Sequence, residues 1–131
     1  MVLDVLQQNG ASSIHSGIDI AAVENTNIYS VLDGIVVFTD FKGAGGYTIS
    51  IKSNNYLISY CHVSPNFIVS VNDIVSKNEI IGQVGPKYVY GVPNNPYKDS
   101  SGKPTNGAST GCHLHLTIKK DGKAVNPLDY F

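Results

Sequence analysis

Every histidine of this chain lies in a short cluster of residues that could bind a metal ion. His15 and Asp19 are four residues apart, His62 lies mid-chain, and His113 and His115 are two residues apart near the C-terminus. Imidazole and carboxylate groups are ligands that zinc takes up in proteins. A hydrolytic zinc needs three protein ligands, so five candidates leave two groups for proton transfer or charge stabilisation. The pattern therefore predicts a zinc hydrolase.

Each cluster alone is modest evidence for a metal. A His-x-His pair such as His113 and His115 often marks only the polar face of a strand, and Asp19 could cap a turn. A lone His62 would be an ordinary half-buried histidine. The combination is stronger because no histidine lies outside it. Residues two apart in a strand face the same side, so His113 and His115 should share a face while Leu114 points into the core.

The first cluster is predicted to be extended rather than helical. Gly17 lies between the β-branched residues Ile14 and Ile18, a combination that favours extended or loop structure. In an extended segment a separation of four residues preserves the facing, so His15 and Asp19 can still converge on one ion.

The composition narrows the classes of function. A chain of 131 residues suits one domain with its own core, and a net charge of -1 gives no sign of a nucleic-acid or anionic-membrane partner. All nine basic residues are lysines, so the bidentate arginine clamp for a free carboxylate or phosphate is missing. An enzyme that cuts within a chain is therefore favoured over a carboxypeptidase or phosphoesterase. We find neither a signal-peptide pattern nor the roughly 20 apolar residues of a membrane span.

Alternating and β-branched residues predict strands in the first half of the chain. Residues 28–38 are rich in Ile, Val, Tyr and Phe, and the Asp33-Gly34 pair within them predicts a hairpin. Residues 47–51 alternate as a half-buried strand does. After a turn, residues 56–62 form a second strand, which His62 should end.

The second half predicts shorter strands. Residues 67–84 hold β pieces around Asn72 and Asn78, two positions where asparagine could adopt the left-handed conformation. The last hairpin should run over residues 112–118, turn at Asp121-Gly122 and end near residue 125. No ten-residue stretch has a convincing helical period.

One long irregular stretch spans residues 85–111. It holds four prolines and several glycines and asparagines, and a loop of this length in a compact domain is usually functional or mobile. Because it leads into the His113 and His115 strand, we expect it to form a wall of the active-site groove. Its tyrosines, Tyr88, Tyr90 and Tyr97, are candidate substrate contacts. The alternative is a tolerated surface insertion.

Seven short motifs follow one another along nearly the whole chain. They are residues 15–22 (His-Ser-Gly-Ile-Asp-Ile-Ala-Ala), 33–34 (Asp-Gly), 45–47 (Gly-Gly-Tyr), 60–62 (Tyr-Cys-His), 81–85 (Ile-Gly-Gln-Val-Gly), 109–115 (Ser-Thr-Gly-Cys-His-Leu-His) and 125–127 (Val-Asn-Pro). In content and order they resemble the landmarks of the lysostaphin/LytM-type zinc endopeptidases. The chain departs from that pattern at residues 23–27, where the family usually has a proline and a glycine. Its insertion at residues 86–108 is also longer than the family's common link, which bears on substrate preference.

The resemblance implies a fold and an activity. The fold is all-β and mainly antiparallel, a lysostaphin/LytM-like β core of the duplicated-hybrid-motif type, with a narrow groove flanked by loops. The activity is cleavage of short peptide bonds in bacterial peptidoglycan, in Gly- or Ala-containing cross-bridges or at D-Ala-to-bridge junctions. We expect residues 1–131 to be a single catalytic domain of a larger, secreted or phage-delivered bacteriolytic polypeptide. It should be monomeric and act outside the cell or at the cell wall.

The same resemblance implies the roles of the site residues. His15, Asp19 and His115 would bind one Zn²⁺ per chain and leave a fourth position for water. We take His113 as the general base on that water, and His62 as a group that hydrogen-bonds the water or stabilises the oxyanion. Which of these two takes the proton stays open. Tyr60 is a weaker candidate for a transition-state contact, with packing as its alternative role.

The two cysteines each precede a site histidine. By strand alternation Cys61 and Cys112 should face away from the metal, where two neighbouring strands could bring them together in a disulfide. The alternative is two buried free thiols.

Other classes of function remain to be weighed against the peptidase. One is a catalytically silent LytM-like module that binds cell wall or a protein partner, although such modules generally lose ligands that this chain keeps. Another is a cupin-like metal barrel, in which the His-x-His pair normally comes first rather than last. A purely structural zinc site is disfavoured by the surplus histidines.

Overall fold

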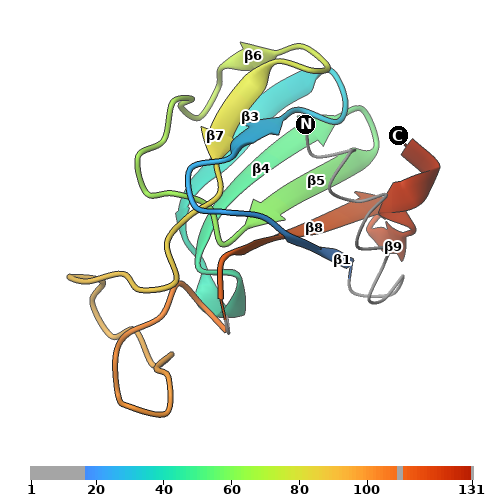
Figure 1. The fold of residues 1–131 in the computed structure, drawn as a ribbon. Helices are drawn as coiled ribbons and strands as arrows, with labels where there is room; N and C mark the ends of the chain where they lie inside the picture. Colours follow the sequence, from blue (N-terminus) through green and yellow to red (C-terminus); the bar gives the residue numbers. More distant parts are fainter. Residues whose placement is uncertain (1–16, 109–110, 131) are drawn as a thin grey trace.

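Nearly all regular secondary structure in the described residues is antiparallel strand, as the alternating pattern predicted. This computed structural model describes residues 17–108 and 111–130 (Figure 1). The strands are β1 (Ile18–Ala21), β2 (Asn27–Tyr29), β3 (Gly34–Phe41), β4 (Tyr47–Ser53), β5 (Tyr56–Cys61), β6 (Ile74–Val75), β7 (Ile80–Gln83), β8 (His113–Lys120) and β9 (Lys123–Val125). Within those ranges the only helical segments are two 3-10 turns, η1 (Gly43–Gly45) and η2 (Pro127–Tyr130). The expected all-β fold is confirmed.

Two sheets of unequal size form the fold. The large sheet has the order β1-β8-β5-β4-β3-β6, with β9 also paired to β8, and the small sheet consists of β2 and β7. Ile28 of β2 and Ile81 of β7 belong to the same buried cluster as Ile49 and Ile58 of the large sheet. The small sheet therefore covers one face of the large one, which we call the inner face.

Alternation along β8 separates core residues from the candidate site residues. Leu114 and Leu116 are almost completely buried on the inner face, whereas His113 and His115 keep part of their surface. Full burial of a leucine side chain stabilises the fold by about 1.5–3 kcal/mol, so this register is strongly preferred over a one-residue slip. His113 and His115 therefore share one face of the sheet, as the His-x-His spacing predicted.

The hairpin expected at Asp33-Gly34 is wrong. β2 pairs with β7, and β3 pairs with β4 and β6, so this dipeptide carries the chain from the small sheet to the large one. A Cβ at Gly34 would lie 2.4 Å from the carbonyl oxygen of Lys52. The glycine is required for that close approach and not for a tight hairpin turn.

The expected turns elsewhere are confirmed. β4 and β5 form a hairpin, as do β8 and β9, with Asn54 (φ 53°) and Asp121 (φ 53°) in the left-handed region. Asn72 and Asn78 also have positive φ values, of 80° and 70°. Asparagine tolerates this region because its short side chain can hydrogen-bond locally.

The long loop leaves the sheet region as a separate projection. In the described part, residues 85–108, it holds no named strand, only isolated bridges between Tyr88 and Thr105 and between Lys98 and Pro104. Figure 1 shows it, in yellow and orange, extending from one end of the large sheet. Among the residues that the structure describes, no helix is long and apolar enough to cross a membrane.

Candidate active site

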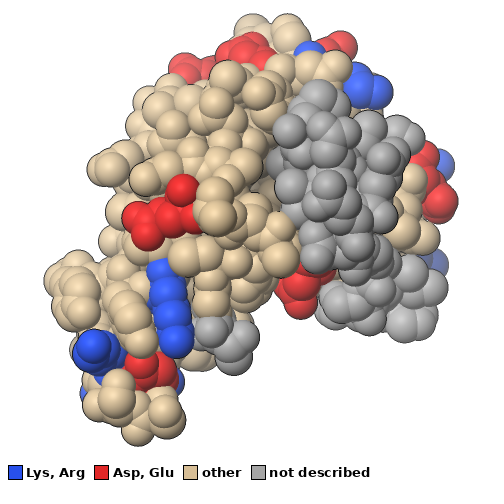
Figure 2. Space-filling model, in the orientation of Figure 1, with Lys and Arg blue, Asp and Glu red and all other residues tan. Residues whose placement is uncertain are grey.

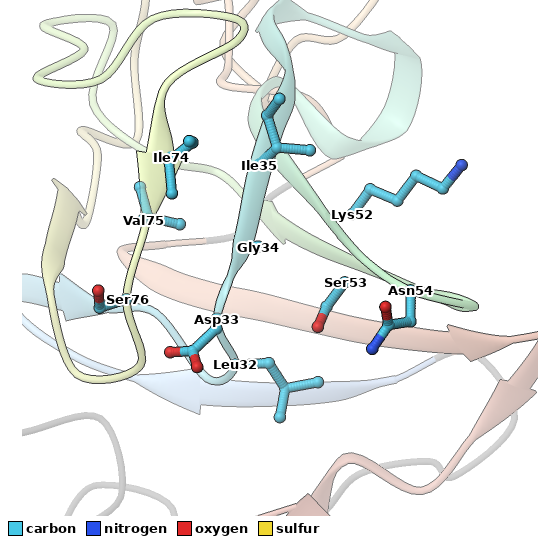
Figure 3. A pocket seen from close by; sticks show the side chains of 10 residues that line it. All are labelled: Leu32, Asp33, Gly34, Ile35, Lys52, Ser53, Asn54, Ile74, Val75 and Ser76. Atoms are coloured by element: carbon cyan, nitrogen blue, oxygen red, sulfur yellow. The ribbon is translucent and has the colours of Figure 1, made fainter.

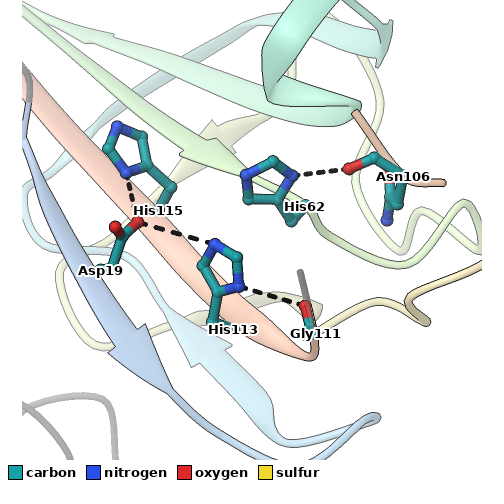
Figure 4. Close-up of polar contacts among 6 residues, drawn as sticks. All are labelled: Asp19, His62, Asn106, Gly111, His113 and His115. Atoms are coloured by element: carbon teal, nitrogen blue, oxygen red, sulfur yellow. Dashed lines mark hydrogen bonds and ion pairs between the residues drawn. The ribbon is translucent and has the colours of Figure 1, made fainter. Parts of the chain in front are cut away.

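Two neighbouring strands place a carboxylate between two imidazoles. β1 pairs with β8 so that Asp19 lies opposite His115 and Ala21 opposite His113. His115 Nδ1 is 2.6 Å from Asp19 Oδ1, and His113 Nε2 is 3.6 Å from the same oxygen (Figure 4). Directly opposite residues in an antiparallel pair share a face, so this meeting follows from strand register.

His62 reaches the same place from the end of β5. Its φ of 61° lies in the left-handed region, which is uncommon for a residue other than glycine. Its backbone N–H donates to the carbonyl of Gly45 at 2.8 Å, and its carbonyl accepts from the N–H of Gly85 at 3.0 Å. The His62 ring centroid is 4.7 Å from that of His113. Strained backbone of this kind persists where surrounding contacts hold it, and it clusters at functional sites.

Backbone carbonyls orient two of the rings. His62 Nδ1 donates to the carbonyl of Asn106 at 2.6 Å, and His113 Nδ1 donates to the carbonyl of Gly111 at 3.1 Å (Figure 4). A carbonyl can only accept, so in each neutral ring the proton sits on Nδ1 and Nε2 is left as an acceptor. Burial lowers the pKa of His62 to about 4, and the nearby His113 and His115 add to this lowering. His62 is therefore neutral at neutral pH.

These side chains line one pocket at the end of the large sheet, which we call the site pocket. Its volume is about 340 Å³, and small residues form the rest of its wall. The lining residues are Asp19, Ala44, Gly45, Cys61, His62, Ala108, His113 and His115.

A larger hollow lies elsewhere and has a different lining. This far pocket, of about 740 Å³, is bordered by residues 32–35, 52–54 and 74–76 (Figure 3). Asp33 and Lys52 are its charged members, and it holds no histidine. It offers none of the convergent imidazoles that the site pocket has.

The predicted metal ligands are only partly within the described residues. His15 lies outside them, and in the described ranges no group of three or more His, Cys, Asp or Glu side chains is arranged to hold a metal ion. Asp19 and His115 fit the donor chemistry of zinc, since they present a carboxylate oxygen and an imidazole nitrogen to each other. Two ligand atoms on a tetrahedral zinc lie about 3.3 Å apart. Asp19 Oδ1 and His115 Nδ1, now 2.6 Å apart, would need to move apart by less than about 1 Å to bind an ion together.

Tyr60 requires a correction. Its side chain has no exposed surface, it lies opposite Leu116 in the core, and its hydroxyl accepts from the N–H of Val31 at 2.9 Å. Burial raises the pKa of its phenol to about 12. The expected facing with His62 fails because the positive φ at His62 ends the strand alternation. Tyr60 packs in the core and does not line the site pocket.

The same break in alternation overturns the predicted disulfide. Cys61 lies opposite His115 and lines the site pocket, whereas Cys112 packs against the core cluster, so the two sulfurs belong to opposite faces. Both cysteines are free thiols. Burial raises the pKa of the Cys61 thiol. The expectation that Cys61 faces away from the site is also wrong.

The tyrosines of the long loop do not border the site pocket. Tyr88 donates its hydroxyl to Asp99 at 2.5 Å, Tyr90 is 71% exposed, and the Tyr97 N–H donates to Asn95 Oδ1 at 3.0 Å. The loop reaches the pocket through its C-terminal end, where Ala108 is part of the wall. Direct contact of these tyrosines with substrate stays a prediction.

Asn106 is a site residue that the sequence did not reveal. It is fully buried, and its carbonyl holds His62. Its side-chain Oδ1 accepts from the N–H of Tyr47 at 2.8 Å, and its Nδ2 donates to the carbonyls of Val63 at 3.0 Å and Pro86 at 3.3 Å. Those partners are 20 to 59 residues away in sequence, so no local pattern marks this asparagine.

Comparison with known proteins identifies the family of the chain. The family model of peptidase family M23 matches residues 13–95, more than half of the chain. This chain belongs to peptidase family M23. The resemblance read from the motifs is confirmed at this level.

The family relationship extends to named relatives and to a solved structure. DD-carboxypeptidase/endopeptidase Mpg of Neisseria meningitidis is 31% identical over 116 residues, 88% of this chain and 22% of Mpg. Peptidoglycan DD-endopeptidase ShyA of Vibrio cholerae is 30% identical over 115 residues, 87% of this chain and 22% of ShyA. The catalytic domain of lysostaphin from Staphylococcus simulans has the same fold, with a TM-score of 0.68 at 23% identity over 92% of this chain and 82% of that one. This chain thus spans about a fifth of the length of Mpg and of ShyA.

Proposed function

We propose that this M23 chain is the catalytic domain of a zinc-dependent endopeptidase that hydrolyses short peptide bonds in bacterial peptidoglycan. One observation carries the proposal: Asp19 Oδ1 is 2.6 Å from His115 Nδ1, in a pocket that also holds the His62 and His113 rings. One carboxylate and three imidazoles in a single pocket provide both metal ligands and proton acceptors.

The metal would be held by His15, Asp19 and His115, one zinc ion per chain. The sequence motifs supply all three, and the described pair of Asp19 and His115 has the donor chemistry that zinc needs. Bound zinc supplies a Lewis acid that polarises a carbonyl and lowers the pKa of a bound water toward about 7.

Proton transfer would fall to His113 and His62. Both rings donate Nδ1–H to a backbone carbonyl, so both present an Nε2 lone pair that can accept a proton. His113 Nε2 lies on the Asp19 side of the pocket, which suits a general base on water there. His62, once it has accepted a hydrogen bond or a proton, can in turn stabilise developing charge.

Small residues beside the histidines favour a small substrate residue. Ala44, Gly45 and Ala108 complete the pocket wall, which leaves room for glycine or alanine next to the scissile bond. The absence of arginine removes the usual clamp for a terminal carboxylate and favours internal cleavage. Gly- or Ala-containing cross-bridges and D-Ala-to-bridge junctions satisfy both conditions, and ShyA is named for its action on peptidoglycan.

The setting follows from this substrate. We propose a single, monomeric catalytic domain, carried by a larger secreted or phage-delivered polypeptide, that acts bacteriolytically at the cell wall. Its partners would be peptidoglycan peptides and not nucleic acid.

Metal content and wall digestion together test the proposal. Purified protein would be assayed for bound zinc, then incubated with purified walls of defined bridge chemistry, and the released muropeptides would be identified by mass spectrometry. We expect about one zinc per chain, new amino groups and a defined cut in one bridge type. Stoichiometric zinc with no released amino groups would instead support a silent module that binds the wall or a partner. Undiminished hydrolysis after exhaustive chelation would overturn zinc dependence.

A further inference from the structure

Charge is unevenly distributed in this nearly neutral chain. Residues 86–108, which we call the basic lobe, carry three lysines and one acidic residue, a net charge of +2. The rest of the chain keeps six lysines and nine acidic residues, a net charge of -3. Figure 2 shows blue atoms gathered on the projecting lobe at the lower left of that view. The overall charge of -1 therefore hides a cationic region.

Backbone hydrogen bonds give the lobe an ordered framework. The N–H of Val89 donates to the carbonyl of Pro104 at 3.2 Å, and the N–H of Asp99 donates to that of Lys103 at 3.0 Å. Closer to the sheet, the N–H of Asn106 donates to the carbonyl of Lys87 at 2.9 Å. These cross-links place charged side chains at defined positions, which lowers the entropy cost of binding through them.

The single carboxylate of the lobe is occupied by its own loop. Asp99 Oδ2 accepts the Tyr88 hydroxyl at 2.5 Å, while Oδ1 accepts from the N–H of Ser101 at 2.9 Å, its hydroxyl at 2.7 Å and the N–H of Lys103 at 3.0 Å. These hydrogen bonds, that from Tyr88 first, hold the pKa of Asp99 well below its usual range. In the described ranges the ion pairs found involve Asp19 and histidines, so Lys87, Lys98 and Lys103 have no carboxylate partner there.

Two of these lysines are gathered on one aromatic ring. Lys87 Nζ is 5.2 Å and Lys103 Nζ 5.4 Å from the centroid of Tyr88, whose hydroxyl is held by Asp99. A cation–π contact orients an ammonium group while leaving N–H donors for solvent or a ligand. Tyr90, 71% exposed, adds an apolar surface nearby in the chain. The result is an anchored pair of cations beside exposed aromatic surface.

The lobe joins the site pocket at its base. The backbone N–H of Asn106 donates to the carbonyl of Lys87, and the carbonyl of Asn106 accepts from His62 Nδ1. Ala108, two residues further on, lines the site pocket. The lobe is therefore connected to the wall of the site pocket through residues 106–108.

We propose that the basic lobe is a docking surface for the carboxylates of peptidoglycan peptide stems, next to the bond being cut. The inference rests on the proposed function and adds a specificity determinant to it. Lys87 and Lys103 are its anchors, because they are oriented by Tyr88 and lack an acidic partner in the described structure. Charge complementarity identifies the occupant: peptide stems carry free carboxylates, and the lobe offers lysine ammonium groups to them.

A matched pair of double variants tests the lobe. Lys87→Gln with Lys103→Gln removes the anchored cations, and Lys120→Gln with Lys123→Gln is the control. The control removes the same charge at the β8–β9 turn, where Lys120 also lies over a tyrosine, with its Nζ 5.7 Å from the Tyr56 centroid. The substrates are one bridged muropeptide with free stem carboxylates and the same molecule with those carboxylates amidated. Both kcat/KM and binding of a fluorescently labelled form, by anisotropy, are measured.

We expect the lobe variant to lose about 3–10-fold in kcat/KM and in affinity for the carboxylate form, as for the loss of one or two exposed ion pairs. The amidated substrate should be cleaved equally by both variants and by the wild type, and Lys87→Arg with Lys103→Arg should restore the preference. Wild-type preference should also fall as salt rises. Equal losses in the control variant, or equal losses on both substrates, would overturn the lobe assignment. Charge-selective binding by a wild type that cleaves neither substrate would refute the proposed function while supporting the lobe, and absence of both would refute both.

Discussion

The site pocket and the far pocket show that the larger hollow is not the one where ionisable side chains converge. The far pocket is the larger, about 740 Å³ against about 340 Å³, yet its charged residues are Asp33 and Lys52. Asp33 already accepts the N–H of Lys77 at 2.7 Å, a contact between residues 44 apart in the chain. In the site pocket, Asp19, His62, His113 and His115 converge from β1, β5 and β8.

The difference lies in what holds the polar groups. Strand register brings Asp19 to His115, and backbone carbonyls orient His62 and His113. Ring positions and acceptor atoms are thus set before any substrate arrives, which is what electrostatic preorganisation requires. The far pocket has no such arrangement among its described residues, so exposed side chains at its border, such as Asp33 and Ile74, should tolerate change.

The largest effect is expected when Asp19 is removed from the site pocket. Removal of Asp33 from the far pocket is the matched comparison. Asp19→Ala should lose bound zinc and reduce wall hydrolysis to background, and His15→Ala should behave alike, because a zinc left with two protein ligands binds poorly. Asp33→Ala, the same change in the far pocket, should keep both properties. Metal analysis and release of amino groups are the measurements. A zinc-loaded, active Asp19→Ala protein would contradict the ligand assignment.

Removal of a proton acceptor should separate metal binding from catalysis. His113→Ala and His62→Ala should each retain zinc and lose about 10²–10⁴ in kcat, the usual contribution of acid–base assistance. Circular dichroism would verify the fold, and zinc content would be measured in the same preparations. If either variant kept the wild-type rate, the histidine that it lacks would have no role in the mechanism.

Asn106→Ala should reduce both stability and activity while sparing the metal. It leaves the Tyr47 N–H and the carbonyls of Val63 and Pro86 without their buried partner, at about 1–3 kcal/mol for each unsatisfied group. Displacement of the Asn106 carbonyl would also release His62. Denaturant unfolding and kcat would be measured together, with Asn106→Asp retaining only the acceptor to Tyr47. Full activity of a destabilised Asn106→Ala protein would restrict this residue to a structural role.

A smaller difference is expected in the reactivity of the two cysteine thiols, which lie on opposite faces of the sheet near the site pocket. Both cysteines should be free, and Cys112, which is partly exposed, should react with an alkylating agent faster than buried Cys61. Mass spectrometry of non-reduced protein, with and without alkylation, counts the thiols and their rates. A mass lower by two hydrogens would instead reveal the disulfide.

The smallest effect is expected at the exposed edge of the far pocket. Ile74 is 83% exposed, so Ile74→Ser should change the free energy of unfolding by no more than about 0.5 kcal/mol and leave turnover unchanged. Thermal unfolding and wall hydrolysis provide the measurement. A clear loss of turnover would show that the far pocket contributes to function.

Features governed by near neighbours in the chain were predictable from sequence. The alternation of Leu114 with His113 and His115 depends only on the period of a strand, and it placed both histidines on one face. The left-handed Asn72 and Asn78, the β4–β5 hairpin and the β8–β9 hairpin follow from local turn chemistry in the same way.

Errors arose where one residue interrupted a local rule. The positive φ at His62 lets both His62 and its neighbour Cys61 border the pocket, which reversed the facing expected for Cys61 and Tyr60. At Asp33-Gly34, pairing of β2 with β7 replaced the expected hairpin, because burial of Ile28 and Ile81 against the large sheet outweighs a local turn preference.

Motif and periodicity thus picked out the aspartate and the three histidines that line the site pocket, since residue type and strand spacing are written in the chain itself. Their meeting came from long-range packing: Asp19 finds a partner 96 residues away, and Asn106 holds a histidine 44 residues away. The net charge of residues 86–108 can be counted from the sequence, but the contact of Lys87 and Lys103 with the same tyrosine depends on the tertiary structure. Contacts of this kind depend on the summed free energy of sheet pairing and core burial, which no short window of residues contains.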